Sequence, residues 1–242
     1  MKTILVIPAR YKSTRFPGKP LIDLAGKSMI QRVFEQCAKV YPIEKIYVAT
    51  EDERIVTHCE NFGIQVILTS DNCLTGTDRI AEVALQIEAD YYINVQGDEP
   101  VLNPDDITIL INILKQINGT ILNGYCDIAN ESDYKSVSVP KVVLRPDGRL
   151  LYMSRASIPG NKKNMFNFGY RQVCIYAFPK EALIAFKNMD IKTTFEAEED
   201  IEILRFLEMG YEVQMIKMSK DSIPIDNPED VEKVLERIGN VK

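Results

Sequence analysis

Basic side chains are concentrated in a short segment that follows the first apolar run of the chain, Thr3–Ile7. Within ten positions this segment contains four of them: Arg10, Lys12, Arg15 and Lys19. If the apolar run is a strand, the segment leads toward a helix, where backbone N–H groups and a helix dipole favour anions. Arginine adds a planar fork that holds two phosphate oxygens at once. The segment therefore predicts a site for a phosphate-rich ligand, with a solvated basic loop as the alternative.

An acidic turn follows another apolar run, Tyr91–Val95. The chain continues as Gln96-Gly97-Asp98-Glu99-Pro100, so a glycine bends the chain and two carboxylates come next. Carboxylates at the end of a strand suit a hard cation such as Mg²⁺ that bridges phosphate oxygens. Asp226 precedes the last predicted helix and is a second candidate, although the local sequence does not pair it with Asp98. An ordinary acidic turn and a helix cap are the alternatives.

Two common nucleotide motifs are absent. The basic segment is neither a Walker A loop nor a G-x-G-x-x-G fingerprint, which argues against hydrolytic NTPases and dinucleotide enzymes.

A third loop, Thr75–Ile80, combines hydroxyl groups with Gly76 and leads into a predicted helix. Such a loop contacts a base or a ribose through backbone groups, or it simply caps the helix.

The composition excludes several kinds of site. His58 is the sole histidine, so a histidine-based zinc site and a Ser-His-Asp triad are both disfavoured. The five cysteines are scattered and form no C-x-x-C pair, which indicates reduced thiols. A net charge of −6 argues against nucleic-acid binding. Acid–base or metal chemistry must therefore depend on Asp, Glu, Lys, Arg and Tyr.

The apolar runs also bear on location. The longest of them are much shorter than the roughly 18 residues that a membrane span needs. The N-terminus has one lysine and a short apolar run, without the longer apolar region of a signal peptide. We therefore expect a cytoplasmic protein without membrane insertion.

Strand-like and helix-like segments alternate through the first half of the chain. We expect strands at Thr3–Ile7, Lys45–Thr50, Val66–Thr69 and Tyr91–Val95, and helices at Met29–Val40, Glu51–Asn61, Asp78–Leu85 and from Pro104. This order predicts an α/β fold with a mostly parallel sheet and helices on both faces. Ligands of such sheets bind outside the carboxyl ends of the strands, where the basic segment and the acidic turn lie.

The second half has a different pattern. A Pro-Asp-Gly turn between Val142–Leu144 and Arg149–Met153 predicts a hairpin. The remaining expected elements are a strand at Gln172–Phe178, helices at Lys180–Lys187 and Phe195–Glu208, a strand at Tyr211–Lys217 and a helix at Pro228–Ile238. No linker or repeat is evident. We expect one domain over residues 1–242, with the region 140–180 projecting as a lobe or forming a dimer contact.

Taken together and in this order, these segments resemble the 3-deoxy-manno-octulosonate cytidylyltransferases, from Ile4 to about Leu235. The most specific matches are Ile7–Tyr11, Ser13–Leu21 and Val95–Pro100. Supporting matches are Thr75–Arg79, Leu151–Ala156 with Ile158-Pro159, Ile175–Phe178 and Asp226–Asp230. The resemblance implies a Rossmann-like nucleotide-diphospho-sugar transferase fold and a homodimer. It also implies CTP, Mg²⁺ and an ulosonic acid sugar such as Kdo, for bacterial lipopolysaccharide or capsule synthesis.

The resemblance also implies three sets of site residues. The nucleotide set is Arg10, Arg15, Lys19, Gly76, Thr77 and Arg79, and the metal set is Asp98 and Asp226. The sugar set is Gln96, Arg155, Gln172, Tyr176, Glu199 and Glu202. Glu199 and Glu202 are three positions apart in a predicted helix and would share one face of it, although a solvated acidic face has the same pattern.

The implied reaction is an in-line attack of the sugar's anomeric hydroxyl on the α-phosphorus of CTP, with pyrophosphate leaving. Lys19, Asp98 and Arg15 are the expected catalytic residues. Asp98 would hold an ion that lowers the pKa of the hydroxyl, while a second ion bound with the triphosphate, helped by Lys19 and Arg15, would stabilise the leaving group. No dedicated protein base is evident.

Three departures from the family lie where the sugar is expected. They are Gln172 in place of a histidine, Ile203 in place of a common glutamine, and a shortened segment 160–168. The acceptor is therefore expected among Kdo and its relatives, including amino-substituted ulosonic acids. The alternatives are a CMP-sialic or legionaminic-type synthetase and a non-catalytic nucleotide-binding protein. The joint presence of Asp98 and Asp226 argues against a pure binder.

Overall fold

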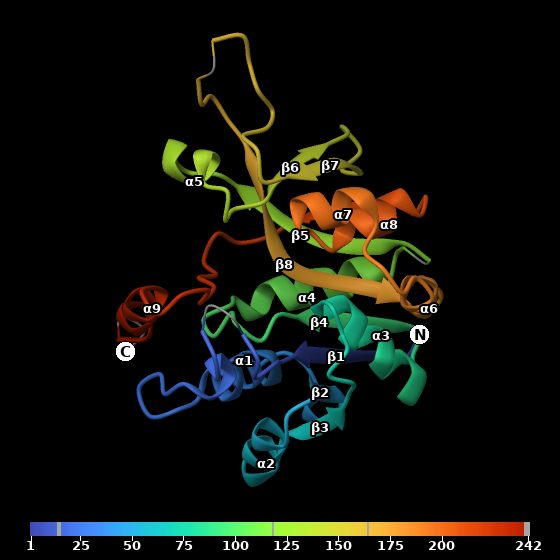
Figure 1. Cartoon of the computed structure of the whole chain (residues 1–242), viewed down its shortest axis with the longest axis vertical. Helices are drawn as coiled ribbons and strands as arrows, with labels where there is room; N and C mark the ends of the chain where they lie inside the picture. The colour runs from blue at the N-terminus through green and yellow to red at the C-terminus, as the bar shows by residue number, and fades with distance from the viewer. Residues whose placement is uncertain (14–15, 118, 164, 240–242) are drawn as a thin grey trace.

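The computed structural model describes residues 1–13, 16–117, 119–163 and 165–239, and the strands in this part of the chain form one sheet (Figure 1). The strands are β1 Thr3–Pro8, β2 Ile46–Thr50, β3 Gln65–Leu68, β4 Tyr91–Val95, β5 Ile121–Asp127, β6 Lys141–Leu144, β7 Leu150–Ser154, β8 Tyr170–Pro179 and β9 Val213–Lys217. The helices are α1 Met29–Ala38, α2 Glu53–Asn61, α3 Gly76–Gln86, α4 Pro104–Leu114, α5 Glu131–Lys135, α6 Lys180–Lys187, α7 Thr194–Glu199, α8 Ile203–Glu208 and α9 Asp230–Gly239. Short 3-10 turns occupy Lys19–Leu21 and Ile43–Lys45.

The strand order along the main path of the sheet is β3-β2-β1-β4-β8-β5-β9, and β6 and β7 form a hairpin beside β8. β1 is parallel to β2 and β4, β2 is parallel to β3, and β5 is parallel to β9. β8 runs antiparallel to β4, β5 and β6. The predicted α/β fold with a mostly parallel sheet is confirmed.

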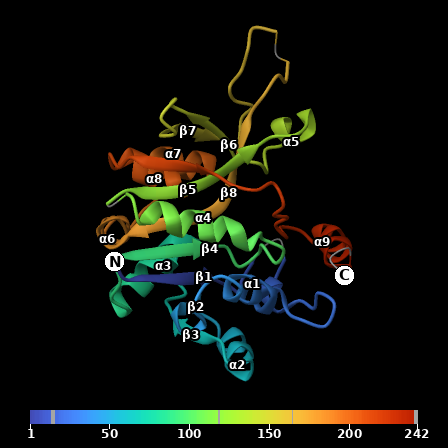
Figure 2. The ribbon, with the colours of Figure 1, turned by 180° about the vertical axis from the view of Figure 1, so that it is seen from behind.

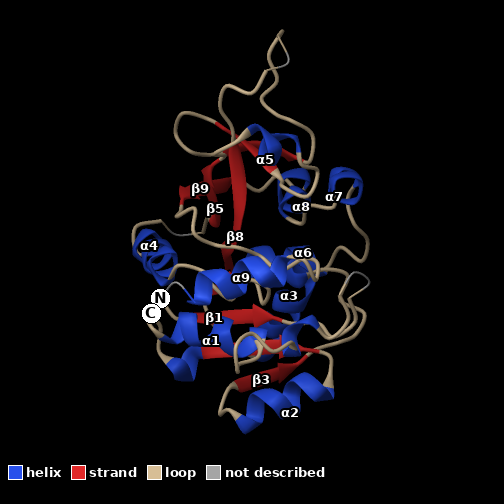
Figure 3. Ribbon diagram, turned by 90° about the vertical axis from the view of Figure 1, so that its left-hand side faces the viewer, coloured by secondary structure: helices blue, strands red, loops and turns tan. Residues whose placement is uncertain are grey.

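Helices cover both faces of the sheet, as the alternating pattern predicts. Successive strand residues point to opposite faces, so Leu5 and Ile7 pack with α1, α2 and α4, whereas Ile4 and Val6 pack with α3, α6 and α8. In Figure 3, α4 lies on one side of β5 and β8, and α6, α7 and α8 lie on the other. Within the described residues, none of these helices is long and apolar enough to cross a membrane.

β8 is longer than β4, and its first half passes the carboxyl edge of the sheet. Val95, the last residue of β4, pairs with Ile175, so the residues Tyr170–Cys174 extend beyond the end of β4. This part of β8 pairs instead with β5 and, near its start, with β6. The first half of β8 therefore lies beside the point where the chain leaves β4 and continues to Gln96.

The prediction of one helix over Phe195–Glu208 is wrong. α7 ends at Glu199, Asp200 adopts a left-handed conformation with φ of 49°, and α8 is a separate helix. Aspartate tolerates this conformation better than most residues. The guanidinium of Arg155 donates to the carbonyl groups of Glu199 and Asp200 at 2.5 and 2.9 Å, which satisfies acceptors left over at the helix end. Glu199 and Glu202 consequently do not share the face of one helix.

Two elements, β5 and α5, lie outside the sequence predictions. β5 has Asn123 and Gly124 at its centre, and both residue types weaken a strand pattern. The register of β5 with β8 shifts between these two residues. A Cβ atom on Gly124 would lie 2.8 Å from Cγ2 of Ile175, so the strands approach closely at a position that requires glycine.

The region 140–180 and the C-terminal helix α9 lie in different parts of the fold. β6, β7 and the described residues between β7 and β8, all within the region 140–180, project from the rest of the molecule (Figure 1). After β9 the chain crosses the molecule to α9, next to α1 (Figure 2). There Ile225 and Val234 complete an apolar cluster with Leu24 and Met29. The C-terminal segment thereby returns to the part of the protein that carries the basic loop, residues 10–19.

Candidate active site

Lys19 and Asp98 meet at the carboxyl edge of the sheet. Lys19 Nζ lies 2.8 Å from Asp98 Oδ2 and 2.7 Å from the carbonyl oxygen of Ile225. The N–H of Ile225 donates in turn to the carbonyl group of Asp98 at 2.9 Å. The basic loop, the acidic turn (residues 96–100) and the chain before α9 are therefore joined at one point. Because Asp226 follows Ile225, the two predicted metal ligands lie on segments that are hydrogen-bonded to each other.

The acidic turn packs tightly on the end of β1. A Cβ atom on Gly97 would lie 2.6 Å from the carbonyl oxygen of Pro8, so any side chain here would push the turn away from the strand. The close approach of these two backbones explains the glycine. It also fixes Asp98 beside the start of the basic loop.

Side-chain hydrogen bonds attach the C-terminal segment 219–226 to the acidic turn and to the start of α4. Ser219 donates its N–H and its hydroxyl to the carboxylate of Asp106 at 2.8 and 2.7 Å. The hydroxyl of Ser222 donates to Glu99, which is buried. Burial raises the pKa of Glu99 to about 7. Glu99 therefore anchors the segment that leads to Asp226.

The basic loop is closed by its own backbone. The N–H of Gly18 donates to the carbonyl group of Tyr11 at 3.0 Å, and Gly18 has a φ of 71° that favours glycine. The guanidinium of Arg54 stacks on the ring of Tyr11, with Cζ 3.3 Å from the ring centroid. The hydrogen bond therefore brings the two ends of the loop, at Arg10 and Lys19, close to each other.

Of the two arginines of this loop, Arg10 is within the described residues and Arg15 is not. Arg10 is exposed. A hydrogen bond from Lys192 lowers the pKa of Asp200, and the charge of Arg10 adds a smaller contribution. Arg15 lies outside the described residues, and its role stays a prediction.

Glu202 contacts the start of α3 directly. Its carboxylate accepts the N–H of Gly76 at 3.1 Å, the N–H of Thr77 at 2.9 Å and the Thr77 hydroxyl at 2.5 Å. Burial raises the pKa of Glu202, although these hydrogen bonds act in the opposite direction. A Cβ atom on Gly76 would lie 3.4 Å from Nε2 of Gln96, so Gln96 is adjacent. Predicted nucleotide and sugar residues thus meet at the start of one helix.

Arg79 points into the protein. It is 4% exposed, its guanidinium lies 2.8 Å from the carboxylate of Glu51, and it donates to the hydroxyl of Thr69. The other oxygen of Glu51 accepts the N–H of Tyr11 at 3.1 Å. Arg79 therefore supports the basic loop through Glu51, and its guanidinium is already engaged within the protein.

Arg155 and Glu199 contact each other between β7 and α7. Glu199 accepts the Ser154 hydroxyl at 2.6 Å and the N–H of Arg155 at 2.8 Å. Burial alone would raise the pKa of Glu199, but these hydrogen bonds lower it overall. The Arg155 guanidinium also donates to the carbonyl group of Val137 at 2.9 Å. Both side chains tie α7 to the end of β7.

Gln172 and Tyr176 lie on β8, and both are buried. Gln172 Nε2 donates to the Tyr176 hydroxyl at 3.1 Å. Cys174 lies between them in the strand. Burial raises the pKa of Cys174, and the carboxylates of the acidic turn and of Glu202 raise it further. Alternate residues of a strand share a face, so these three side chains lie on the face of the sheet that is covered by α3, α6 and α8.

Two residues that support the site, Glu51 and Asn123, are not among the site residues predicted from the sequence. Glu51 has the sequence context of an acid that opens a helix, and its partner Arg79 is too distant in the chain for any local signal. Asn123 lies in the strand that the sequence does not predict, and it accepts a hydrogen bond from Gln172. A polar residue inside an otherwise apolar run is the signal that points to Asn123.

The donor atoms at Asp98 and Asp226 suit a divalent cation. Carboxylate oxygens are the ligands that Mg²⁺ prefers, and the Asp98 side chain is 28% exposed. Among the described residues, no group of three or more His, Cys, Asp or Glu is arranged to hold a metal. Magnesium is commonly bound by one or two carboxylates with substrate phosphates completing its shell. The donor set therefore fits a cation that binds together with a phosphate ligand.

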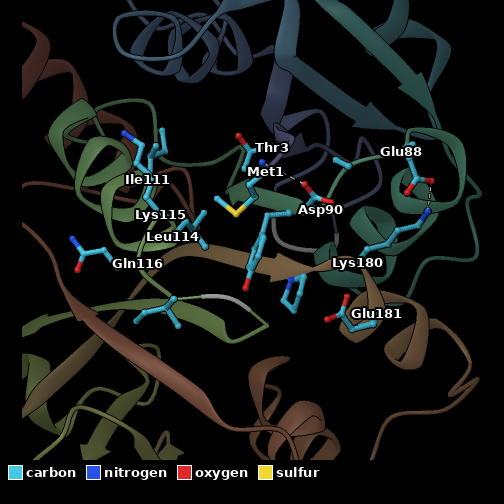
Figure 4. Close-up of a pocket in the computed structure, with 14 residues that line it drawn as sticks. Met1, Thr3, Glu88, Asp90, Ile111, Leu114, Lys115, Gln116, Lys180 and Glu181 are labelled. Atoms are coloured by element: carbon cyan, nitrogen blue, oxygen red, sulfur yellow. Dashed lines mark hydrogen bonds and ion pairs between the residues drawn. The ribbon is translucent and has the colours of Figure 1, made fainter.

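A separate cleft of about 920 Å³ lies at the opposite edge of the sheet, at the start of β1 and β4 (Figure 4). The N-terminal ammonium lies 3.9 Å from Asp90 there, and Lys180 forms an ion pair with Glu88. None of the predicted site residues lines this cleft. We assign this cleft no function.

Known proteins match the chain over nearly its whole length. A family model described as cytidylyltransferase matches residues 4–220. The 3-deoxy-manno-octulosonate cytidylyltransferase of Protochlamydia amoebophila is 38% identical over 239 residues, which cover 96% of this chain and 92% of that protein. The enzyme of the same name from Geobacter metallireducens is 39% identical over 253 residues, covering 98% of each chain.

Solved structures match in the same way. A structure of CMP:2-keto-3-deoxy-manno-octonic acid synthetase complexed with CTP is 33% identical, with a TM-score of 0.92 and 99% of each chain covered. HddC from Yersinia pseudotuberculosis is 17% identical, with a TM-score of 0.73 and coverage of 98% of this chain and 100% of that one. The second likeness concerns the fold alone.

Proposed function

This chain belongs to the cytidylyltransferase family and, within it, to the 3-deoxy-manno-octulosonate cytidylyltransferases, and we propose that it transfers CMP from CTP to a 3-deoxy-2-ulosonic acid. The acceptor is Kdo or a close relative, and pyrophosphate is released. The junction of Lys19, Asp98 and Ile225 carries the proposal, because it joins the basic loop, the acidic turn and the segment before Asp226 at the edge of the sheet where such folds bind ligands.

The basic loop is assigned to the triphosphate. Arg10 and Lys19 lie at the two ends of this loop, and the hydrogen bond between Gly18 and Tyr11 brings these ends close to each other. We assign Lys19 and Arg15 to the charge that develops on the pyrophosphate. Gly76 and Thr77 are assigned to the cytidine, with Arg79 acting through Glu51 and the basic loop.

Asp98 and Asp226 are assigned to Mg²⁺. When bound, the ion supplies positive charge that polarises phosphate oxygens and lowers the pKa of a coordinated hydroxyl. The protein's own contribution is to fix the two carboxylates. Ser219 and Ser222 fasten the chain before Asp226, and Gly97 sets the position of Asp98. In-line attack then depends mainly on positioning and on neutralisation of phosphate charge.

The sugar is assigned to the space bounded by β8, the acidic turn and Glu202. Gln96, Gln172 and Tyr176 supply polar groups there, and burial of Gln172 and Tyr176 supports a desolvated site. Arg155 and Glu199 are assigned a supporting role, because each is engaged at the junction of β7 and α7. Glu202 links this space to the nucleotide loop.

Assembly and location follow from other features. We propose one domain over residues 1–242 that works as a homodimer through the lobe at 140–180. Exposed large apolar side chains in and beside the lobe support this contact: Val137, Leu151, Met165 and Phe168. The five cysteines are free, which suits the reducing cytoplasm. The product is proposed to feed lipopolysaccharide or capsule synthesis.

The alternatives are less well supported. The relatives named above are 3-deoxy-manno-octulosonate enzymes, so a sialic or legionaminic-type synthetase is not favoured. A panel assay tests the proposal: pyrophosphate release with CTP, Mg²⁺ and Kdo, an amino-substituted Kdo, a sialic acid or a legionaminic acid. We expect turnover with Kdo or the amino sugar. CTP binding without turnover of any sugar would instead indicate a non-catalytic protein.

A further inference from the structure

Asn123 is held in one orientation by the irregular pairing of β5 and β8. The register shift after Asn123 leaves carbonyl groups of β8 without regular ladder partners. Asn123 Nδ2 donates to the carbonyl oxygens of Val173 and Ile175 at 3.1 and 3.0 Å. Carbonyl oxygens only accept hydrogen bonds, so the NH₂ group of the buried Asn123 must face them. Its Oδ1 is therefore turned the other way, toward Gln172.

The orientation of Asn123 determines the orientation of Gln172. Asn123 Oδ1 only accepts, so Gln172 must present its NH₂ group, and Nε2 lies 2.9 Å from that oxygen. The second N–H of Gln172 is directed to the Tyr176 hydroxyl at 3.1 Å. Both amide hydrogens of Gln172 are therefore used inside the protein. Turning the amide over would place two acceptors against each other.

The remaining polar atom of Gln172 is its carbonyl oxygen. Oε1 has no hydrogen-bond partner among the described residues. It is also not one of the side-chain polar atoms that are both fully buried and unpaired, so it is accessible to solvent or to a ligand. Gln172 lies in the part of β8 that extends past the end of β4, next to the acidic turn. An acceptor atom is thus available at the wall of the proposed sugar site.

We propose that Asn123 is a positioning residue that fixes Gln172 as a hydrogen-bond acceptor, so that the sugar must offer an O–H or N–H donor at this point. The inference rests on the proposed function and concerns the polarity of the same site. A hydroxyl or ammonium group of the sugar satisfies Oε1. A sugar without that donor leaves Oε1 desolvated and unpaired. The free-energy cost of such an unpaired polar atom discriminates strongly between similar ligands.

The test uses Kdo analogues in which one hydroxyl at a time, other than the anomeric one, is replaced by hydrogen or by fluorine. Fluorine is close in size to hydroxyl but cannot donate. For one position, both replacements should lower kcat/KM of the wild-type enzyme by about tenfold or more. In Gln172→Met the preference for the hydroxyl at that position should fall to within about twofold, because methionine lacks the Oε1 acceptor.

Two further variants complete the test. Asn123→Ala frees the Gln172 amide to turn, so it should raise KM for the sugar and weaken the same preference while leaving KM for CTP unchanged. If Asn123→Ala does not fold, the comparison of Gln172→Met with the wild type decides alone. The matched control is Gln214→Met on β9, whose side chain donates to the carbonyl group of Asp147 instead. This control should keep the full preference.

The outcomes separate the inference from the function beneath it. Turnover of Kdo with no position that distinguishes hydroxyl from fluorine overturns the assigned polarity and leaves the function intact. A preference that persists in Gln172→Met overturns the role of Gln172. Absence of pyrophosphate release with every ulosonic acid, despite CTP binding, overturns the proposed function and the inference together.

Discussion

The ammonium of Lys19 lies 2.8 Å from the carboxylate of Asp98, and the same ammonium lies 2.7 Å from the carbonyl oxygen of Ile225. One side chain therefore connects the basic loop to the acidic turn and to the segment before α9. The two proposed metal ligands thus have fixed positions relative to the proposed triphosphate loop. The predictions below test whether these contacts control binding and turnover.

Removal of the Asp98 charge should abolish most of the activity. In Asp98→Asn, turnover should fall by about 10³-fold or more, because charge neutralisation dominates phosphoryl-type transfer. CTP should still bind, since the basic loop is intact. Steady-state turnover and calorimetric CTP titration measure both effects. Asp105→Asn, on the exposed first turn of α4, is the matched control and should behave as wild type. Normal turnover of Asp98→Asn would overturn the metal assignment.

The Glu51–Arg79 pair should influence CTP binding from a distance. Glu51→Gln removes one partner of a buried ion pair, which costs about 3–5 kcal/mol of unfolding free energy. It also weakens the contact to the Tyr11 N–H, so KM for CTP should rise more than KM for the sugar. Glu53→Gln, exposed at the start of α2, is the control. An unchanged KM for CTP in folded Glu51→Gln would show that this pair is only structural.

Ile225 should couple stability to activity. It is fully buried in the cluster with Leu24 and Met29, so Ile225→Ala should cost about 2–5 kcal/mol of unfolding free energy. The adjacent Asp226 should lose its fixed position, and kcat should fall even under conditions where the variant is folded. Leu235→Ala on the partly exposed side of α9 should lose less stability and retain kcat. A folded Ile225→Ala with wild-type kcat would contradict the coupling.

The junction of β7, α7 and α8 should be sensitive to acid. Hydrogen bonds from Ser154 and Arg155 outweigh burial and hold the pKa of Glu199 below its ordinary 4.5, and Lys192 holds the pKa of Asp200 below 3.8. The folded state therefore binds fewer protons than the unfolded state in this range. The resulting stability is fully present above pH 4.5 and is lost as pH falls through the lowered pKa values.

Thermal unfolding as a function of pH checks this expectation. Below pH 4.5 the wild-type midpoint should fall, and in Glu199→Gln the fall should be smaller, because one of the lowered carboxyl groups no longer titrates. Glu198→Gln, an exposed neighbour, is the control and should follow the wild-type curve. Equal acid sensitivity of wild type and Glu199→Gln would contradict the argument.

Much of the fold could be predicted because local patterns determine it. β4 and α6 have the predicted bounds, since alternating or helical spacing of apolar residues is a property of the segment itself. The break between α7 and α8 could not be predicted in this way. It depends on Asp200 in a left-handed conformation and on Arg155, which contacts the helix end from a different part of the chain. Such a contact leaves no trace in local periodicity.

The site also has a part that local sequence patterns predict and a part that depends on contacts between distant segments. The basic loop and the acidic turn are recognisable because each concentrates charge at the end of a strand. The meeting of Asp98 with the chain at Asp226 is not, because it depends on backbone hydrogen bonds of Ile225 and on the anchors at Ser219 and Ser222. The orientation of Gln172 likewise depends on Asn123 and on an irregular strand pairing. Only the assembled fold brings these groups together.

The central claim is that Asp98 and Asp226 hold one divalent cation beside the triphosphate. Electron paramagnetic resonance of Mn²⁺ titrated into the protein with CTP measures this directly in wild type, Asp98→Asn, Asp226→Asn and the double variant. We predict that each single change weakens the same bound ion by about tenfold or more and that the double change weakens it little further. Wild-type Mn²⁺ affinity in Asp226→Asn, or independent losses that add in the double variant, would contradict a shared ion.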